Sequence, residues 1–155
     1  MARACANWIR GDHPKRRFWY GIPGARSKIT SGVQLFGSST FWLFWKDGYS
    51  AMAALDDNAD AWLSGKELKG LSLWQDRNRN GVSEPGEVTP IDATEIAALA
   101  VNSTGTDGGF ISNSQGLRLK SGALLPTWDW VATAGPRGGR AGRLSPPAAA
   151  LPARE

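Results

Sequence analysis

Between residues 30 and 131, short stretches of alternating apolar and polar residues are separated by turn residues. Val33 and Leu35 alternate with polar neighbours, residues 37–38 interrupt the pattern, and residues 41–45 are continuously apolar. Alternation with a period of two is typical of a half-buried strand, and a short apolar run is typical of a fully buried one. The pattern therefore predicts a β-hairpin whose second strand is the more buried.

Two short helices are predicted next. Asp47 can cap a helix over residues 48–55, because its side chain can accept a hydrogen bond from an amide of the first turn. Ser64 and Glu67 have the spacing of a capping box, which predicts a helix over residues 65–74. The large apolar residues of this second helix recur on one face: Leu68, Leu71 and Trp74.

The C-terminal part of this region has the pattern of strands. We expect a strand over the last part of residues 96–101 and a hairpin formed by residues 117–119 and 125–131. Pro126 has no backbone N–H to donate to a neighbouring strand, so the second arm of this hairpin is predicted to be an edge strand.

Charge is segregated along the chain. Residues 1–29 hold seven Lys or Arg and one Asp, residues 30–131 hold seven basic and twelve acidic side chains, and residues 132–155 hold four Arg and one Glu. The net charges of +6, −5 and +3 sum to the overall +4. We interpret these segments as a basic, poorly ordered N-terminal segment, a folded acidic domain, and a disordered tail rich in Gly, Pro, Ala and Arg.

Several classes of protein are disfavoured by composition. Cys5 is the only cysteine, which excludes an intrachain disulfide and a thiolate metal cluster. No apolar run approaches the roughly 20 residues that span a bilayer, and the first residues lack the apolar core of a signal peptide. His13 is the only histidine, and no nucleophile or phosphate-binding loop accompanies it, so we predict no enzyme activity. Residues 15–20 are basic and aromatic but are better explained as a solvated end, and no nucleic acid is expected as a partner.

Two stretches of twelve residues carry the candidate chemistry. The second loop, residues 76–87, has Asp or Asn at positions 1, 3 and 5, Gly at position 6 and Glu at position 12; the first loop, residues 56–67, differs only by Ala61 at position 6. This spacing suits Ca²⁺, which takes six to eight oxygens from these side chains, from position 9 and from the carbonyl of position 7. The predicted ligands of the first loop are Asp56, Asn58, Asp60, the carbonyl of Trp62, Ser64 and Glu67. Those of the second loop are Asp76, Asn78, Asn80, the carbonyl of Val82, Glu84 and Glu87.

The second loop is the stronger candidate of the two. Position 6 requires a positive φ, which Gly81 adopts freely and which would strain Ala61 by roughly 1 kcal/mol or more. Position 8 joins paired loops through a small β-bridge when it is apolar, as Leu63 is in the first loop; Ser83 occupies this position in the second.

Only eight residues separate the two loops, so the helix over residues 65–74 has to leave the first loop and enter the second. The run from residue 48 through both loops to residue 88, with its motifs Leu73–Trp74 and Gly86–Glu87, resembles the compact EF-hand calcium-binding pair of large bacterial surface and secreted proteins, including haemolysin-like RTX proteins. The resemblance implies calcium binding and an extracellular or cell-surface parent protein, and it implies no catalytic activity. The resemblance to dockerins, which space such loops more widely, is weaker.

The sequence thus predicts an α+β fold in which short helices brace two EF-hand-type calcium loops, flanked by β-hairpins and with disordered ends. Calcium is expected to act structurally, by cancelling repulsion between carboxylates that folding brings together. The alternative is a dockerin-like interaction module, ordered by calcium and recognised by another protein or by the remainder of a longer parent chain. Such a module would expose Leu73 or Trp62, whereas a structural unit would bury them. Core packing is the expected role of three tryptophans in apolar contexts: Trp42, Trp45 and Trp74.

Overall fold

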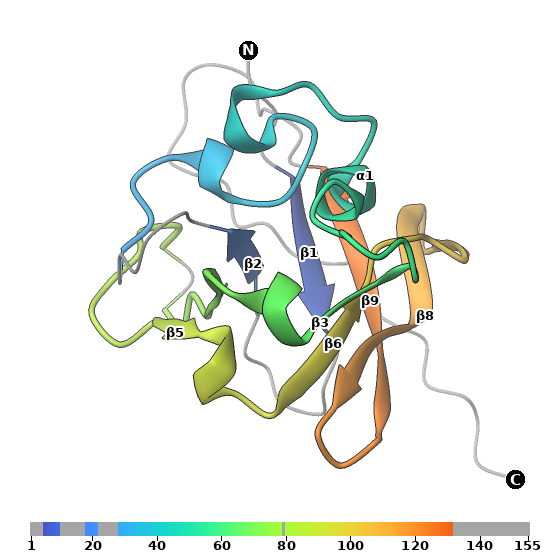
Figure 1. Ribbon diagram of the computed structural model, residues 1–155. Coiled ribbons are helices and arrows are strands. Elements are labelled where there is room, and N and C mark those ends of the chain that lie inside the picture. The colour runs from blue at the N-terminus through green and yellow to red at the C-terminus, as the bar shows by residue number, and fades with distance from the viewer. Residues whose placement is uncertain (1–4, 10–17, 22–27, 79, 132–155) are drawn as a thin grey trace, which may run out of the picture.

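The structure is a computed structural model that describes residues 5–9, 18–21, 28–78 and 80–131 (Figure 1). Regular structure in these ranges is mostly β-strand. No helix in these ranges has the length and apolar character needed to cross a bilayer. The predicted tail, residues 132–155, lies outside them.

One antiparallel sheet contains the nine described strands in the order β3-β6-β8-β9-β1-β2-β4-β5, and β7 pairs with β8. The strand bounds are β1 (Cys5–Ile9), β2 (Phe18–Gly21), β3 (Trp62–Ser64), β4 (Leu71–Trp74), β5 (Val88–Pro90), β6 (Ile96–Ala100), β7 (Gly105–Asp107), β8 (Phe110–Leu119) and β9 (Leu124–Val131). Strands β1 and β2 come from the basic N-terminal segment and pair with β9 and β4 respectively. The division into three segments stays a prediction.

The sheet must be curled, because a short connection joins β3, at one end of the strand order, to β4, near the other end. Six inter-strand spacings would separate these strands by about 29 Å in a flat sheet. The chain from Ser64 to Leu71 could span at most about 24 Å if fully extended, and a 3₁₀ turn over Gly65–Leu68 shortens it further. The sheet therefore bends around an interior.

The helical content is small. Among the residues that the structure describes, it consists of one α-helix, α1 (Gly48–Ala53), and four 3₁₀ turns: η1 (Gly32–Gln34), η2 (Thr40–Trp42), η3 (Gly65–Leu68) and η4 (Ile91–Ala93). The cap of α1 is confirmed, since the Asp47 carboxylate accepts a hydrogen bond from the Ser50 amide at 2.7 Å. The predicted fold class is nevertheless wrong, because strands and isolated turns stand where bracing helices were expected.

The helix predicted over residues 65–74 does not form. The capping box of Ser64 and Glu67 is present, but it starts only the η3 turn, and β4 follows. Gly70 separates the two with a φ of +86°, which a right-handed helix cannot contain. As a strand, the segment gains hydrogen bonds to β2 on one side and β5 on the other. Long-range pairing therefore outweighs a local helical pattern.

The hairpin predicted over residues 33–45 is also wrong. The turns η1 and η2 replace its strands. The supposedly buried second strand is largely exposed, with Trp42 at 81% and Phe44 at 94% of their full accessible surface. The core-packing prediction is therefore wrong for Trp42, while Trp74 is buried as expected.

The C-terminal strands are confirmed as β6 and the hairpin of β8 and β9. However, β9 is an inner strand, paired with both β8 and β1. Pro126 is tolerated because it lies outside both ladders. The register with β1 begins at Thr127, and the register with β8 shifts between Asn113 and Leu117.

The main core lies within the curl, where α1 meets the sheet. Its largest fully buried side chains include Phe36, Tyr49, Leu63, Leu99 and Leu117. The Tyr49 hydroxyl donates to the carbonyl oxygen of Thr127 at 3.0 Å and lies 2.9 Å from the Thr127 hydroxyl. A side chain at Gly116 would overlap Thr127, so glycine leaves the space for this contact.

Tyr49 should make the fold sensitive to alkali. Burial raises the pKa of its phenol from 10.0 to about 12, the nearby Asp129 charge adds to the rise, and the hydrogen bond with Thr127 offsets it only in part. The folded pKa exceeds the unfolded one, so this contribution to stability is complete below pH 10 and is lost as the pH rises toward 12. We predict that Tyr49→Phe lowers the free energy of unfolding by about 1 kcal/mol at neutral pH and flattens the alkaline decline. Urea unfolding measured across this range checks both, and an unaltered alkaline decline would contradict the assignment.

Candidate functional site

The second loop connects two paired strands. Residues 76–87 lie between β4 and β5, whose ladder ends with Trp74 opposite Val88. One further backbone bond, from the Gln75 amide to the Glu87 carbonyl at 2.8 Å, continues the pairing to the edge of the loop. The two ends of the loop are therefore held side by side by the sheet.

Asp76 folds the first half of this loop. Its buried carboxylate accepts hydrogen bonds from the amides of Asn80 at 3.1 Å and Gly81 at 2.9 Å. Gly81 has a φ of +71°, as predicted for position 6. The carboxylate thus fixes a sharp reversal of the chain around itself.

Glu87 closes the other end. Its carboxylate accepts hydrogen bonds from the Arg77 amide at 2.9 Å, the Glu84 amide at 3.1 Å and the Trp74 indole N–H at 3.3 Å. Only 4% of its surface is exposed. Burial alone would raise the pKa of Glu87, but these hydrogen bonds and the Arg77 charge outweigh it and hold the pKa below its ordinary value. A carboxylate that stays ionised is therefore built into the closure of the loop.

The amide side chains of the loop contact the remaining carboxylate. The NH₂ groups of Asn78 and Asn80 donate to Glu84 at 2.7 and 3.1 Å. Their oxygens accept from the amides of Asn80 at 3.0 Å and Val82 at 2.7 Å respectively. The structure thus links five of the six predicted ligands of this loop in one network, while the residue that would offer its carbonyl, Val82, is exposed.

The first loop repeats this network position by position. In both loops, the side chain at position 1 accepts hydrogen bonds from the backbone amides of positions 5 and 6. The side chain at position 3 accepts from the amide of position 5, and the side chain at position 5 accepts from the amide of position 7. The glutamate at position 12 accepts from the amides of positions 2 and 9. In residues 56–67 these acceptors are Asp56 (from Asp60 and Ala61), Asn58 (from Asp60), Asp60 (from Trp62) and Glu67 (from Asp57 and Ser64), at 2.8–3.3 Å. The same six hydrogen bonds therefore define the conformation of both predicted sites.

The two loops differ in burial and strain. Asp56 and Glu67 are half-buried, whereas Asp76 and Glu87 are buried. Ala61 adopts a φ of +67°, so the first loop retains the conformation at the cost of the predicted backbone strain. The second loop is the better formed of the two.

The loops are not joined to each other through position 8. Leu63 pairs with Leu99 of β6. The Ser83 hydroxyl instead accepts a hydrogen bond from the Ile29 amide at 3.1 Å. The small β-bridge expected between paired loops is therefore absent at this position, and each loop is attached to a different part of the fold.

No group of three or more His, Cys, Asp or Glu is arranged as a metal cluster among the residues that the structure describes. In both loops, amide groups are bound to the carboxylates, as Asn58 is to Asp60 at 3.2 Å. Each loop thus combines carboxylate groups with the neutral oxygens of amide side chains.

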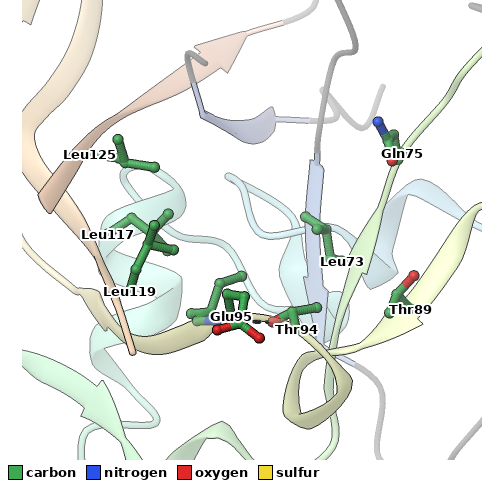
Figure 2. A pocket seen from close by; sticks show the side chains of 9 residues that line it. Leu73, Gln75, Thr89, Thr94, Glu95, Leu117, Leu119 and Leu125 are labelled. Carbon is green, nitrogen blue, oxygen red and sulfur yellow. Dashed lines mark hydrogen bonds between the residues drawn. The ribbon is translucent and has the colours of Figure 1, made fainter. Parts of the chain in front are cut away.

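A pocket of about 310 Å³ lies elsewhere, and none of its lining residues belongs to either loop. Figure 2 shows Leu117, Leu119 and Leu125 on one side of it and Gln75 and Thr89 on the other. Its one ionisable lining side chain is Glu95, which offers no acid–base pair. The absence of enzyme activity stays a prediction.

These features define a class of protein, namely an antiparallel β domain that carries two acidic loops of twelve residues. The chain belongs to the SPM domain family, because the family model of the SPM domain matches residues 25–122. It is similar to the iron-regulated protein FrpA of Neisseria meningitidis serogroup C, with 34% identity over 76 residues. The match covers 46% of this chain and 7% of that relative, so the chain spans only a small part of the relative's length.

The resemblance to compact EF-hand pairs is therefore wrong. An EF-hand places a helix on each side of its loop, whereas β3 lies within the first loop and the second loop lies between two strands. The family match points to the SPM domain instead. Classifying the chain as an EF-hand calcium-binding protein has no support in the fold or in the comparisons.

The residue at position 6 provides a matched test of the shared conformation. No atom lies within 4 Å of a Cβ built on Gly81, so Gly81→Ala changes only the backbone energy. We predict that Gly81→Ala lowers the free energy of unfolding by about 1 kcal/mol and that Ala61→Gly raises it by about 0.5 kcal/mol, because strain is added in one and removed in the other. Urea unfolding measures both. Equal effects of the same sign would contradict a common left-handed position.

Glu87 should govern part of the acid sensitivity. Its folded pKa lies below the ordinary 4.5, so its contribution to stability is complete above that pH and is lost as the pH falls through the folded pKa. We predict that Glu87→Gln lowers stability by about 1–3 kcal/mol at neutral pH and flattens the decline below pH 4.5. Glu95→Gln, at an exposed carboxylate outside the loops, is the control and should retain the decline. The free energy of unfolding, measured from pH 3 to 7, checks both predictions. If Glu87→Gln showed the same pH dependence as the wild type and Glu95→Gln, the prediction would be contradicted.

Proposed function

We propose that the first and second loops each bind a calcium ion and that the ions stabilise the curled sheet. The observation that carries this proposal is the repeated network. Six equivalent hydrogen bonds fold two different twelve-residue sequences into the same conformation, with the closing glutamate brought back to the start of each loop.

The network leaves oxygens available to a cation. Each carboxylate or amide oxygen has two lone pairs, and the backbone amides occupy only some of them. In the second loop, Asp76 and Glu87 supply charge, while Asn78 and Asn80 supply neutral oxygens at the same spacing. A mixture of this kind provides attraction for a divalent cation without concentrating mutual repulsion in one place.

Calcium suits these loops better than magnesium. Calcium accepts six to eight oxygens in an adaptable geometry, including bidentate carboxylates and backbone carbonyls. Magnesium requires near-octahedral geometry and retains several waters, so it is rarely enclosed by a loop of protein oxygens. A binding ion would compete with the amide groups of Asn78 and Asn80 for the carboxylate of Glu84.

A structural role follows from where the loops are attached. The second loop connects β4 to β5, and the first loop follows α1 and contains β3, so the ions would tie both ends of the strand order to their loops. Leu73 is buried and Trp62 is half-buried with Arg118 stacked 4.9 Å from its ring centre. Side chains that an interaction module would present are thus largely covered, which favours the structural role over a dockerin-like one.

We predict that calcium raises the thermal midpoint of the wild-type chain relative to EGTA. A site whose Kd lies tenfold below the free calcium concentration adds about 1.4 kcal/mol to the free energy of unfolding. Glu87→Gln removes the closing carboxylate of the stronger site, and we expect it to lose most of this gain. Calorimetric or circular-dichroism melting in both buffers measures the difference.

Two controls make this test specific. Glu95→Gln should keep the full calcium-dependent rise, because Glu95 lies outside both loops. Magnesium at the same concentration should produce a much smaller rise. A wild-type midpoint that is identical in calcium and EGTA would sink the proposal.

A further inference from the structure

Three consecutive apolar side chains project from the last residue of η2 and the loop that follows it. Trp42, Leu43 and Phe44, together the apolar tip, are exposed over 81%, 56% and 94% of their surfaces. In Figure 1, η1, η2 and this loop gather at the end of the molecule where α1 lies, away from the β8–β9 turn. These side chains belong neither to the hydrogen-bond networks of the two loops nor to the core.

The backbone is strained where it presents the tip. Phe41 has a φ of 54° and Trp42 a φ of 65°, both in the left-handed region. Each such residue costs about 1–2 kcal/mol unless it is glycine. Strain of this kind persists only where surrounding contacts enforce it, and it is concentrated at functional positions.

Hydrogen bonds and packing within the loop enforce this conformation. The Thr40 hydroxyl is fully buried and accepts from the Gly37 amide at 2.7 Å, while the Thr40 carbonyl accepts from the Trp45 indole at 3.1 Å. The Trp45 amide donates to Ser38 at 3.0 Å, which closes the loop behind the tip. Phe41 turns inward and packs edge-on against Phe36, with ring centres 6.1 Å apart. The projection of the next three side chains is therefore a fixed feature of the loop.

One exposed cation adjoins the tip along the chain. Lys46 lies two residues after Phe44, and residues 28–46 contain no Asp or Glu, although residues 30–131 carry a net charge of −5. The first acidic residue afterwards, Asp47, is buried and is engaged in capping α1. An apolar projection with an exposed lysine beside it is complementary to a surface with anionic groups above an apolar interior.

We propose that the apolar tip docks the domain on a lipid bilayer that contains anionic headgroups. Tryptophan and phenylalanine favour the interfacial depth of a bilayer, which an exposed loop can enter by about 5–10 Å, and lysine is attracted to the headgroups. A stable protein partner or a second copy of the chain requires about 800 Å² of buried surface on each side. Two aromatic side chains that bury about 150–250 Å² each, with one leucine, provide less than that. The inference does not depend on calcium binding by the loops.

Co-sedimentation of the full chain with vesicles tests this proposal. In millimolar calcium, we expect binding to vesicles of phosphatidylcholine and phosphatidylserine, and weaker binding to phosphatidylcholine alone. Trp42→Ser combined with Phe44→Ser should weaken binding about tenfold or more, because most of the inserted apolar area is lost. Lys46→Gln should reduce binding less and should lessen its dependence on salt. Leu124→Ser, at another exposed apolar residue, is the matched control and should bind as the wild type does.

The outcomes are separable. The tip variants alter exposed side chains, so an unchanged thermal midpoint establishes that each is folded. Binding that survives in the double variant would place the lipid contact elsewhere, for example at loop carboxylates bridged by calcium, and would overturn the proposal. Absence of binding to both vesicle types would also overturn it. So would self-association of the wild type, seen by light scattering and lost in the double variant, because the occupant would then be a second copy.

Discussion

The closing carboxylate of each loop is the interaction on which the rest of the structure depends. Glu67 and Glu87 each accept an amide hydrogen bond from the start of their own loop and another from three residues before themselves. Each therefore turns twelve residues of chain into a closed unit with fixed ends. In the second loop, this closure brings β4 and β5 together. In the first loop, it positions β3 to pair with β6.

These closed loops lie where the sheet is weakest. Strands β3 and β5 are the two ends of the strand order and contain only three residues each. Strands this short contribute few hydrogen bonds, so their pairing depends on what holds their ends. The η3 turn between β3 and β4 then forces the sheet to curl, and the core with Tyr49 and Leu117 fills the curl. A cation in either loop would strengthen the same closure that the glutamates provide.

The sequence predicted those features that depend on contacts within a few residues. The limits of both loops, the positive φ at Ala61 and Gly81, the Asp47 cap and the β8–β9 hairpin arise from local spacing. The sequence did not predict the features that depend on partners far away along the chain. The residues of β4 fit a helical stripe, but pairing with β2 and β5 makes them a strand. The exposure of Trp42 depends on the hydrogen bonds of the loop around it, such as the one from the Trp45 indole to the Thr40 carbonyl. The same local character explains the mistaken EF-hand resemblance, because the loop network needs no flanking helices.

The central claim is that each loop is a separate cation site closed by its own glutamate. Isothermal titration calorimetry with calcium, performed on the wild type and on Glu67→Gln and Glu87→Gln, tests it most directly. The account predicts two ions per wild-type chain, with one site lost in each variant and the tighter site lost in Glu87→Gln. A chain that takes up no calcium, or whose stoichiometry is the same in all three proteins, would contradict it.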